Sequence, residues 1–140
     1  MPPQVMLSCM RMGPLSIGQF LEIAAAVRDE EAKAIKDETD LGLAESALHA
    51  PFAGFGDYEL FPTFAEKVAI LGSRIAKNHA LTDGNKRTAL VAMGMFATGN
   101  GGELNTTDQD AVAQAIEDVS SGEMHEDDFV AFVQPLVTEP

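Results

Sequence analysis

The stretch His79-Ala-Leu-Thr-Asp83-Gly84-Asn85-Lys86-Arg87, followed by the apolar run Thr88–Phe96, decides how this chain is interpreted. Its nine residues hold a candidate proton acceptor, a carboxylate, a glycine, an amide and two cations. The apolar run predicts a buried helix, so the glycine turn enters a helix N-terminus. Backbone N–H groups in a first helical turn have no intrahelical acceptors, and the helix dipole adds partial positive charge there. The segment therefore predicts an anion site.

A second helix is predicted directly before this motif. Thr63 and Glu66 have the spacing of a capping box. An apolar stripe at helical spacing follows, made of Phe64, Val68, Leu71 and Ile75. His79 comes four residues after Ile75, so we expect it on the same face, in the last turn of this helix. The two helices should then meet at the motif.

The rest of the chain predicts a single all-α domain, a helical bundle, over residues 1–140. Further helices are expected over residues 16–28, 42–50, 107–119 and 124–137, and the motif helix should end near residue 99. Residues 29–40 are highly charged and predict a loop or a frayed helix. Residues 51–62, with two glycines and several aromatic side chains, predict an ordered loop or a small hairpin. Residues 1–14 are expected to be a flexible extension.

Composition and charge narrow the classes of function. The net charge of −13 argues against general binding to nucleic acid or to an anionic membrane. No apolar stretch is long enough to span a bilayer, and the single cysteine, Cys9, suits a reducing compartment, so a cytoplasmic location is expected. Five of the nine basic residues lie between Lys67 and Arg87, where the only carboxylate is Asp83. This asymmetry predicts a local cationic site for a small anion such as a nucleotide.

Each motif residue also has a simpler interpretation. His79 could be a surface or packing histidine, Asp83 a turn residue, and Asn85 a helix cap. Lys86 and Arg87 could be solvated charges in the first turn of a helix. Cations are mildly unfavourable at that position, however, and two in succession favour compensation by a bound anion.

The motif resembles the signature of the Fic/Doc superfamily, H-x-F-x-[D/E]-G-N-[G/K]-R, and its lysine resembles that of the death-on-curing (Doc) branch. Leu41–Pro51 and Phe61–Lys67 are also similar to that branch, and the resemblance runs from about Val27 to Gly101. The phenylalanine of the signature is replaced by Leu81. Leucine should keep the role of an apolar anchor with looser packing.

The resemblance implies a site in which Gly84, Asn85 and Lys86 hold the phosphates of ATP and Arg87 grips the terminal phosphates. Asp83 would hold Mg²⁺ against the same oxygens. His79 would take the proton from a serine, threonine or tyrosine hydroxyl of a target protein. His79, Lys86 and Arg87 are thus the expected catalytic residues.

Lys86 bears on which phosphate is transferred. The AMP-transferring branch of the superfamily has glycine there, and a lysine would fill the second anion pocket and favour transfer of the γ-phosphate. The resemblance implies a toxin that phosphorylates a translation elongation GTPase of the elongation factor Tu class. An AMP transferase and a catalytically lapsed binding module remain as alternatives.

The resemblance also bears on regulation. Many Fic enzymes carry an inhibitory helix with the pattern [S/T]-x-x-x-E-[G/N], and this sequence contains no Glu-Gly or Glu-Asn pair. Restraint is therefore expected from a separate chain, a Phd-type antitoxin with a tail that folds on binding.

Overall fold

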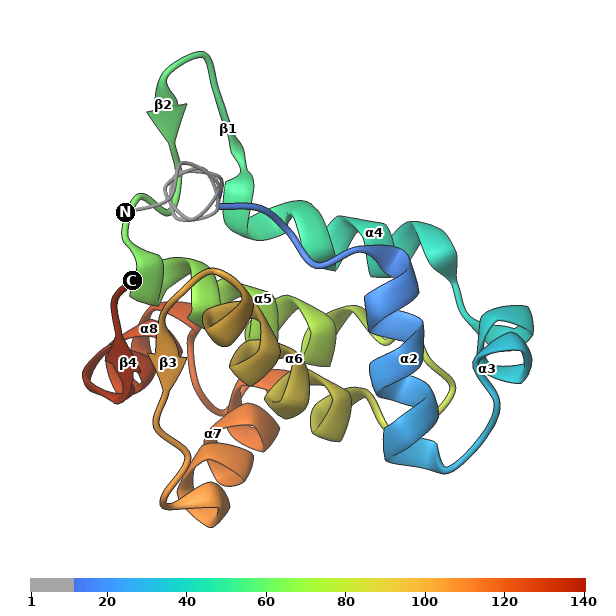
Figure 1. Ribbon diagram of the computed structural model, residues 1–140. Coiled ribbons are helices and arrows are strands. Elements are labelled where there is room, and N and C mark those ends of the chain that lie inside the picture. Colours follow the sequence, from blue (N-terminus) through green and yellow to red (C-terminus); the bar gives the residue numbers. More distant parts are fainter. Residues whose placement is uncertain (1–11) are drawn as a thin grey trace.

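A computed structural model describes residues 12–140, and they fold as helices joined by short loops (Figure 1). The helices are α2 (Ile17–Arg28), α3 (Ala32–Glu38), α4 (Leu41–His49), α5 (Phe64–Asn78), α6 (Asn85–Gly99), α7 (Gln109–Ser121) and α8 (Glu126–Val133). The predicted all-α class is confirmed. Most of the predicted extension, residues 1–11, lies outside the described residues. None of the helices within residues 12–140 is long and apolar enough to cross a membrane.

Two helices begin with capping boxes, and the box before α5 is the one that the sequence predicts. The Ser16 hydroxyl accepts from the Gln19 N–H before α2, and the Thr63 hydroxyl accepts from the Glu66 N–H before α5, both at 3.1 Å. In each box the third helical side chain returns a bond to the N-cap backbone. These contacts satisfy N–H groups that the helix itself leaves without partners, so local sequence fixes where both helices begin.

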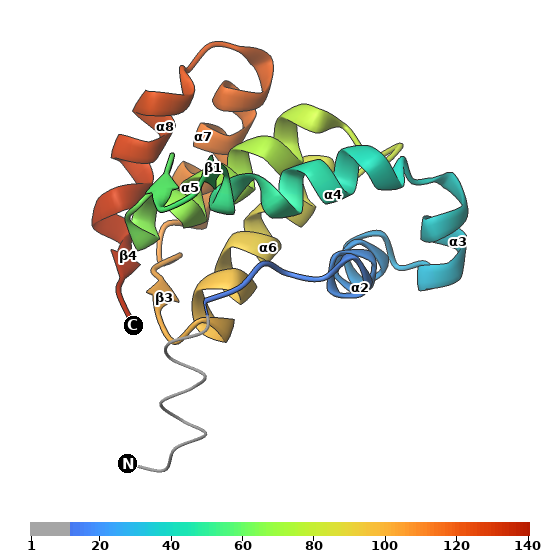
Figure 2. The same ribbon diagram turned by 90° about the horizontal axis from the view of Figure 1, so that it is seen from above.

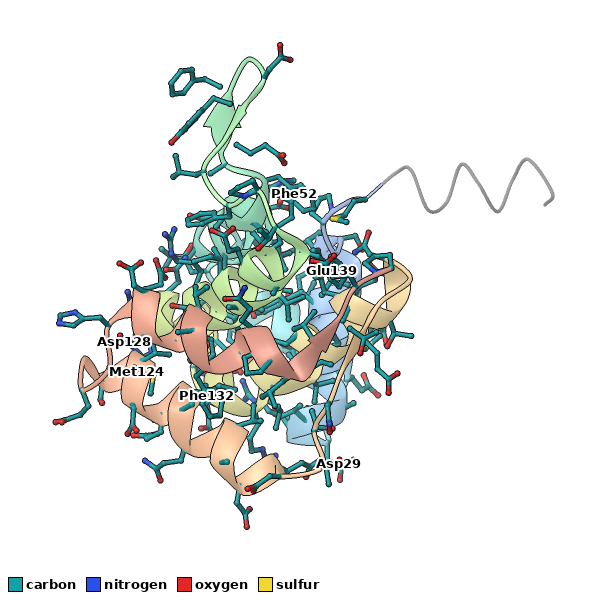
Figure 3. All side chains as sticks on the ribbon, turned by 90° about the vertical axis from the view of Figure 1, so that its left-hand side faces the viewer. Asp29, Phe52, Met124, Asp128, Phe132 and Glu139 are labelled. Atoms are coloured by element: carbon teal, nitrogen blue, oxygen red, sulfur yellow. The ribbon has the colours of Figure 1, made fainter. Side chains whose placement is uncertain are left out.

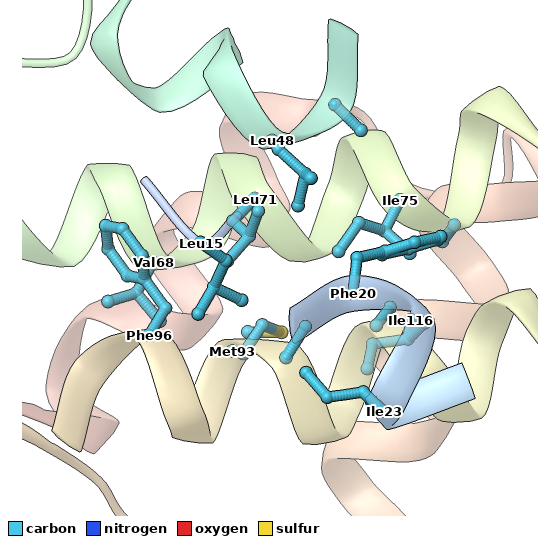
Figure 4. Close-up of a cluster of buried hydrophobic side chains, with 14 of the residues drawn as sticks. Leu15, Phe20, Ile23, Leu48, Val68, Leu71, Ile75, Met93, Phe96 and Ile116 are labelled. Carbon is cyan, nitrogen blue, oxygen red and sulfur yellow. The ribbon is translucent and has the colours of Figure 1, made fainter. Parts of the chain in front are cut away.

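Helix α5 forms the centre of the fold. Helix α4 crosses above it, α6 runs beside it, and α7 and α8 pack on the side away from α2 and α3 (Figures 1 and 2). Figure 4 shows Leu71 and Ile75 of α5 facing Met93 and Phe96 of α6, with Phe20 of α2 closing one end. Burial of these side chains supplies the main favourable free energy of folding.

Gly72 permits the close approach of α5 and α6. A Cβ atom at this position would lie 2.2 Å from Sδ and 2.7 Å from Cγ of Met93. Met93 is fully buried, so its thioether has little free space into which it can move. The pairing of the two helices that carry the motif therefore depends on a residue without a side chain.

Two short strand pairs complete the fold. Strands β1 (Gly54–Phe55) and β2 (Tyr58–Glu59) form an antiparallel hairpin, which is one of the two structures predicted for residues 51–62. A 3₁₀ turn, η1 (Ala50–Phe52), precedes it. Strands β3 (Glu103–Leu104) and β4 (Val137–Thr138) pair antiparallel and were not predicted.

The predicted last helix over residues 124–137 is wrong in its extent. Helix α8 ends at Val133 and is followed by a 3₁₀ turn, η2 (Gln134–Leu136). Pro135 lacks an N–H group and cannot continue the helical ladder. The carbonyl of Leu136 instead accepts from the Asn105 N–H at 2.8 Å, next to the pairing of β3 with β4. Residues 29–40, predicted as a loop or a frayed helix, contain the short helix α3.

Candidate active site

The loop between α5 and α6 is bounded by two residues in the left-handed region. Helix α5 ends at Asn78, and His79 follows as its C-cap with φ of 53°. Gly84 is the N-cap of α6 with φ of 85°. The prediction that His79 continues the apolar face of α5 is therefore wrong, because the backbone reverses at this residue. The His79 side chain is exposed beside the loop.

Leu81 and Asn85 hold this loop in place. Leu81 is only 3% exposed and packs into the core, as predicted for the residue that replaces phenylalanine. The Asn85 side chain accepts from the Leu81 N–H at 3.0 Å and donates to the Leu81 carbonyl at 2.9 Å. The Ala80 carbonyl accepts from the Asp40 N–H at 2.9 Å. Asn85 thus closes the loop on itself, while Gly84 occupies the cap position.

All six predicted site residues line one hollow of about 310 Å³. Together with Thr82, its lining residues are His79, Asp83, Gly84, Asn85, Lys86 and Arg87. The side chains of His79 and Asp83 are both exposed and stand at opposite ends of the loop. The first turn of α6 forms one wall, so its free N–H groups lie at the hollow.

The two cations of the motif extend to opposite sides of α6. Lys86 Nζ lies 2.7 Å from Glu117 Oε2, a carboxylate of α7. Arg87 donates through Nη2 to the carbonyl of Val27, at the end of α2. Positive charge therefore lies on both flanks of the hollow, in the surroundings that a phosphate chain requires.

A family model described as the Fic/DOC family matches residues 14–97. The chain belongs to the Fic/DOC family. It is also 42% identical over 65 residues to a protein named Toxin Doc from Mycolicibacterium smegmatis. That match covers 46% of this chain and 50% of the relative, so the matched region spans half the length of that protein. No solved structure matches the chain.

The five basic residues that cluster in the sequence do not form one site in this Fic/DOC domain. The Lys67 side chain is buried at the far end of α5, where it donates to Glu59 at 2.9 Å and lies over the ring of Phe52. Three other side chains meet on Glu126 of α8, namely Ser73, Arg74 and Lys77. Lys67 is therefore distant from the motif, because a 15-residue helix extends over about 22 Å, whereas Arg74 and Lys77 are nearer to it but pair with Glu126. Lys86 and Arg87 are the two that remain at the motif.

The Fic/DOC motif holds one carboxylate, Asp83, at the hollow. Within residues 12–140 no group of three or more side chains could cage a metal ion. Mg²⁺ usually binds one or two carboxylates together with substrate phosphates and water, rather than a full protein cage. A single exposed carboxylate beside a phosphate-sized hollow fits this kind of site, with Asp83 as the protein ligand.

The structure adds four residues that the motif could not indicate. They lie outside the motif and contact either its loop or the first turn of α6 from other elements: Val27, Arg28, Glu38 and Glu117. A second hollow of about 290 Å³ lies on the α2 side of the loop, between Arg28, Asp83 and Arg87. No spacing in the sequence connects these residues to the motif, since each contact joins segments that are distant in the chain.

Proposed function

We propose that this chain transfers the γ-phosphate of ATP to a hydroxyl group of a target protein, and that it acts as a toxin. The proposal rests on one observation above all. A free histidine, a carboxylate, a helix N-terminus and two flanking cations surround one hollow. This arrangement supplies a base at one end and phosphate-binding groups at the other.

In this proposal the first turn of α6 binds the phosphates of ATP. Asn85 and Lys86 follow Gly84 and line the hollow, so the N–H groups of this turn, which have no acceptors within the helix, are available to phosphate oxygens. The positive φ of Gly84 turns the backbone into the helix. Arg87 leaves the Val27 carbonyl and makes paired bonds to the terminal phosphates. Asn85 keeps the loop closed through its two bonds to Leu81.

The transfer step is a direct displacement at the γ-phosphorus. Nε2 or Nδ1 of His79 takes the proton of the target hydroxyl as its oxygen bonds to the γ-phosphorus. The bond between that phosphorus and the β–γ bridging oxygen breaks, and ADP leaves. Most of the rate enhancement would come from positioning and from neutralised charge, because the reaction needs little covalent help.

Asp83 would hold Mg²⁺ together with the phosphate oxygens. The ion would supply charge neutralisation on those oxygens. Asp83 is exposed and belongs to the same short loop as His79, so its carboxylate is available to the hollow.

Lys86 supports phosphate transfer over AMP transfer. A lysine in the first turn of α6 fills space that a glycine would leave open for a second phosphate. Its ammonium group lies on the α7 flank, held by Glu117, and not toward Arg87. AMP transfer is the second candidate activity, and a catalytically lapsed nucleotide-binding or protein-binding module is the third.

The hairpin supports a protein as the substrate. The hairpin projects from the body of helices (Figure 3). Phe55 is 76% exposed and Tyr58 is 57% exposed, and their rings pack together at 5.4 Å between centroids. The hairpin precedes α5, whereas His79 follows it, so the two are separated by the length of that helix. A substrate that touches both the hairpin and His79 must span about 22 Å, the length of α5, and a protein is large enough to do so. The elongation factor Tu class of translation GTPase is the target that family resemblance suggests.

A separate Phd-type antitoxin would restrain the toxin. The support is the similarity to a protein named Toxin Doc, together with an apolar groove of about 480 Å³ between α2 and α6. Its floor includes Ile23, and its rim includes Val91 and Met95, which are 41% and 46% exposed. Glu22 also lines it, so an amphipathic helix with basic flanks fits both its shape and its charge.

Mass spectrometry of a bacterial lysate treated with the purified chain and ATP tests the proposed function. An added phosphate on one protein, absent with a His79→Ala variant, is the expected result. An added AMP would replace the proposal by AMP transfer, and no added group would favour the lapsed module. Incubation with ATP labelled at the α or the γ position provides an independent check.

A further inference from the structure

Arg28, the last residue of α2, lies at the centre of a polar network beside the motif loop. Its side chain is 13% exposed and pairs with Glu30 at 2.7 Å between Nη2 and Oε2, and with Glu38 of α3. Its Nη1 donates to the Thr82 hydroxyl at 3.1 Å. Thr82 in turn donates to Glu38 Oε1 at 3.0 Å. The consecutive helices α2 and α3 therefore meet the distant motif loop at one hydroxyl group.

Thr82 uses its hydroxyl as both donor and acceptor in this network. A hydroxyl offers a single donor, so its proton is directed to Glu38 while Arg28 approaches the oxygen. Bonds to charged partners are stronger than those between neutral groups. The stem of Arg28 also packs on Gly84, where an added Cβ would lie 3.3 Å from Arg28 Cγ. Arg28 thus contacts the loop on both sides of Asp83.

The network holds the part of the loop that the other contacts leave free. Ala80 and Leu81, the two loop residues before Thr82, are held by hydrogen bonds: Ala80 by the Asp40 N–H and Leu81 by the Asn85 side chain. Among residues 12–140, no hydrogen bond or ion pair holds the Asp83 side chain itself. The direction of the Asp83 carboxylate consequently depends on its neighbours, Thr82 and Gly84.

We propose that Arg28 and Glu38 are positioning residues, which act through Thr82 to aim the Asp83 carboxylate into the phosphate hollow. The inference rests on the proposed function for the role of Asp83 with Mg²⁺ and ATP, but the order of the loop is a property of the protein alone. The hydrogen bond from Thr82, and then that from Arg28, lowers the pKa of Glu38, because both contacts favour the charged carboxylate.

The test compares Thr82→Val, which keeps the shape but removes the hydroxyl, with Thr82→Ser, which keeps the hydroxyl. Thr98→Val on α6 is the matched control, since that threonine is exposed and lies away from the motif. Hydrogen exchange of the amides from Leu81 to Gly84 reports on loop order. The Mg²⁺ concentration that half-saturates ATP binding, measured by calorimetry, reports on Asp83.

We expect Thr82→Val to accelerate exchange in the loop by about tenfold and to raise the required Mg²⁺ concentration by a similar factor. Thr82→Ser and Thr98→Val should stay within about twofold of the wild type. Wild-type exchange in Thr82→Val would overturn the inference. Faster exchange with an unchanged Mg²⁺ requirement would also overturn it, because the network would then order the loop without aiming Asp83.

These outcomes are separable from those of the proposed function. A wild-type protein that binds Mg²⁺ and ATP but transfers no phosphate would refute the transferase and leave the positioning role intact. Normal transfer by the wild type, combined with unchanged exchange in Thr82→Val, would refute the positioning role alone.

Discussion

Lys86 of the motif and Glu117 of α7 form an ion pair with 2.7 Å between Nζ and Oε2. The two side chains are 47% and 49% exposed. Exposed pairs of this kind contribute at most about 1 kcal/mol to stability, because water screens the charges and both side chains lose freedom. The pair is therefore strong enough to direct the lysine and weak enough to yield to a phosphate.

Removal of this carboxylate should favour nucleotide binding. Glu117→Gln takes away a charge that both competes for Lys86 and repels phosphate, so the KM for ATP should fall about two- to fivefold with little change in kcat. Glu123→Gln, an exposed glutamate after the end of α7, is the matched control for net charge. A raised KM in Glu117→Gln would contradict this and indicate that the pair prepares Lys86 for the nucleotide.

Lys86 itself should determine the chemistry. Lys86→Gly opens the space that the lysine side chain fills and removes a positive charge next to the phosphates. The rate of γ-phosphate transfer should fall, because the transition state loses stabilisation on the order of several kcal/mol. A partial gain of AMP transfer is expected, and ATP labelled at the α position would detect it. If Lys86 were only a solvated charge, the substitution would lower the stability of the fold by about 1 kcal/mol, which is the cost of glycine within a helix, and activity would survive. Phosphorylation at the wild-type rate would thus show that lysine does not select the reaction.

His79 should be needed for transfer but not for folding. Its side chain is exposed and its backbone lies in the left-handed region, which asparagine tolerates better than alanine does. We expect His79→Asn to lose about 10²- to 10⁴-fold in kcat while its melting temperature and ATP affinity stay near those of the wild type. His79→Ala should lose the same activity with a slightly larger loss of stability. Full activity in either variant, measured with γ-labelled ATP, would remove the histidine from the mechanism.

The contact between α5 and α6 should be sensitive to one methyl group. Gly72→Ala forces a Cβ against the buried thioether of Met93, and overpacking of this kind costs about 1–3 kcal/mol. Gly94→Ala on α6 is the control, because an added Cβ there meets nothing within 4 Å, and alanine favours a helix more than glycine does. It should stabilise the fold by about 0.5–1 kcal/mol. Urea unfolding of both variants measures the free energy of unfolding, which should fall in Gly72→Ala and rise in Gly94→Ala.

Stability should fall at acid pH through Glu126. Burial alone would raise the pKa of Glu126, but hydrogen bonds from Arg74 and Ser73 and the charge of Lys77 hold it below its ordinary value of 4.5. The stabilisation is therefore fully present above that value and is lost as the pH falls through the lower folded pKa. The free energy of unfolding of Glu126→Gln should be lower than that of the wild type at neutral pH and should change less below pH 4.5. Parallel titration curves for the two proteins would contradict this assignment.

The sequence by itself determined the features that depend on near neighbours. The capping box at Thr63, the helix that begins after Ser16, the apolar stripe of α5 and the glycine turn before α6 each depend on residues within a few positions of one another. Such contacts form wherever the local backbone is helical, so spacing alone reveals them. The six motif residues meet at one hollow for the same reason, because one short loop and the helical turn that follows it carry them.

Only the tertiary structure decided how the charges are distributed and what holds the loop. Lys67 lies at the far end of α5, where it pairs with Glu59. Arg74 and Lys77 lie nearer to the motif in the sequence, but their side chains pair with Glu126 of α8. Conversely, Arg28 and Glu117 are distant from the motif in the sequence, and the packing of α2 and α7 against α6 brings them to Thr82 and Lys86 of the motif. The pairing of two charges depends on the distance between their atoms, and that distance is fixed by helix packing over the whole core rather than by separation along the chain.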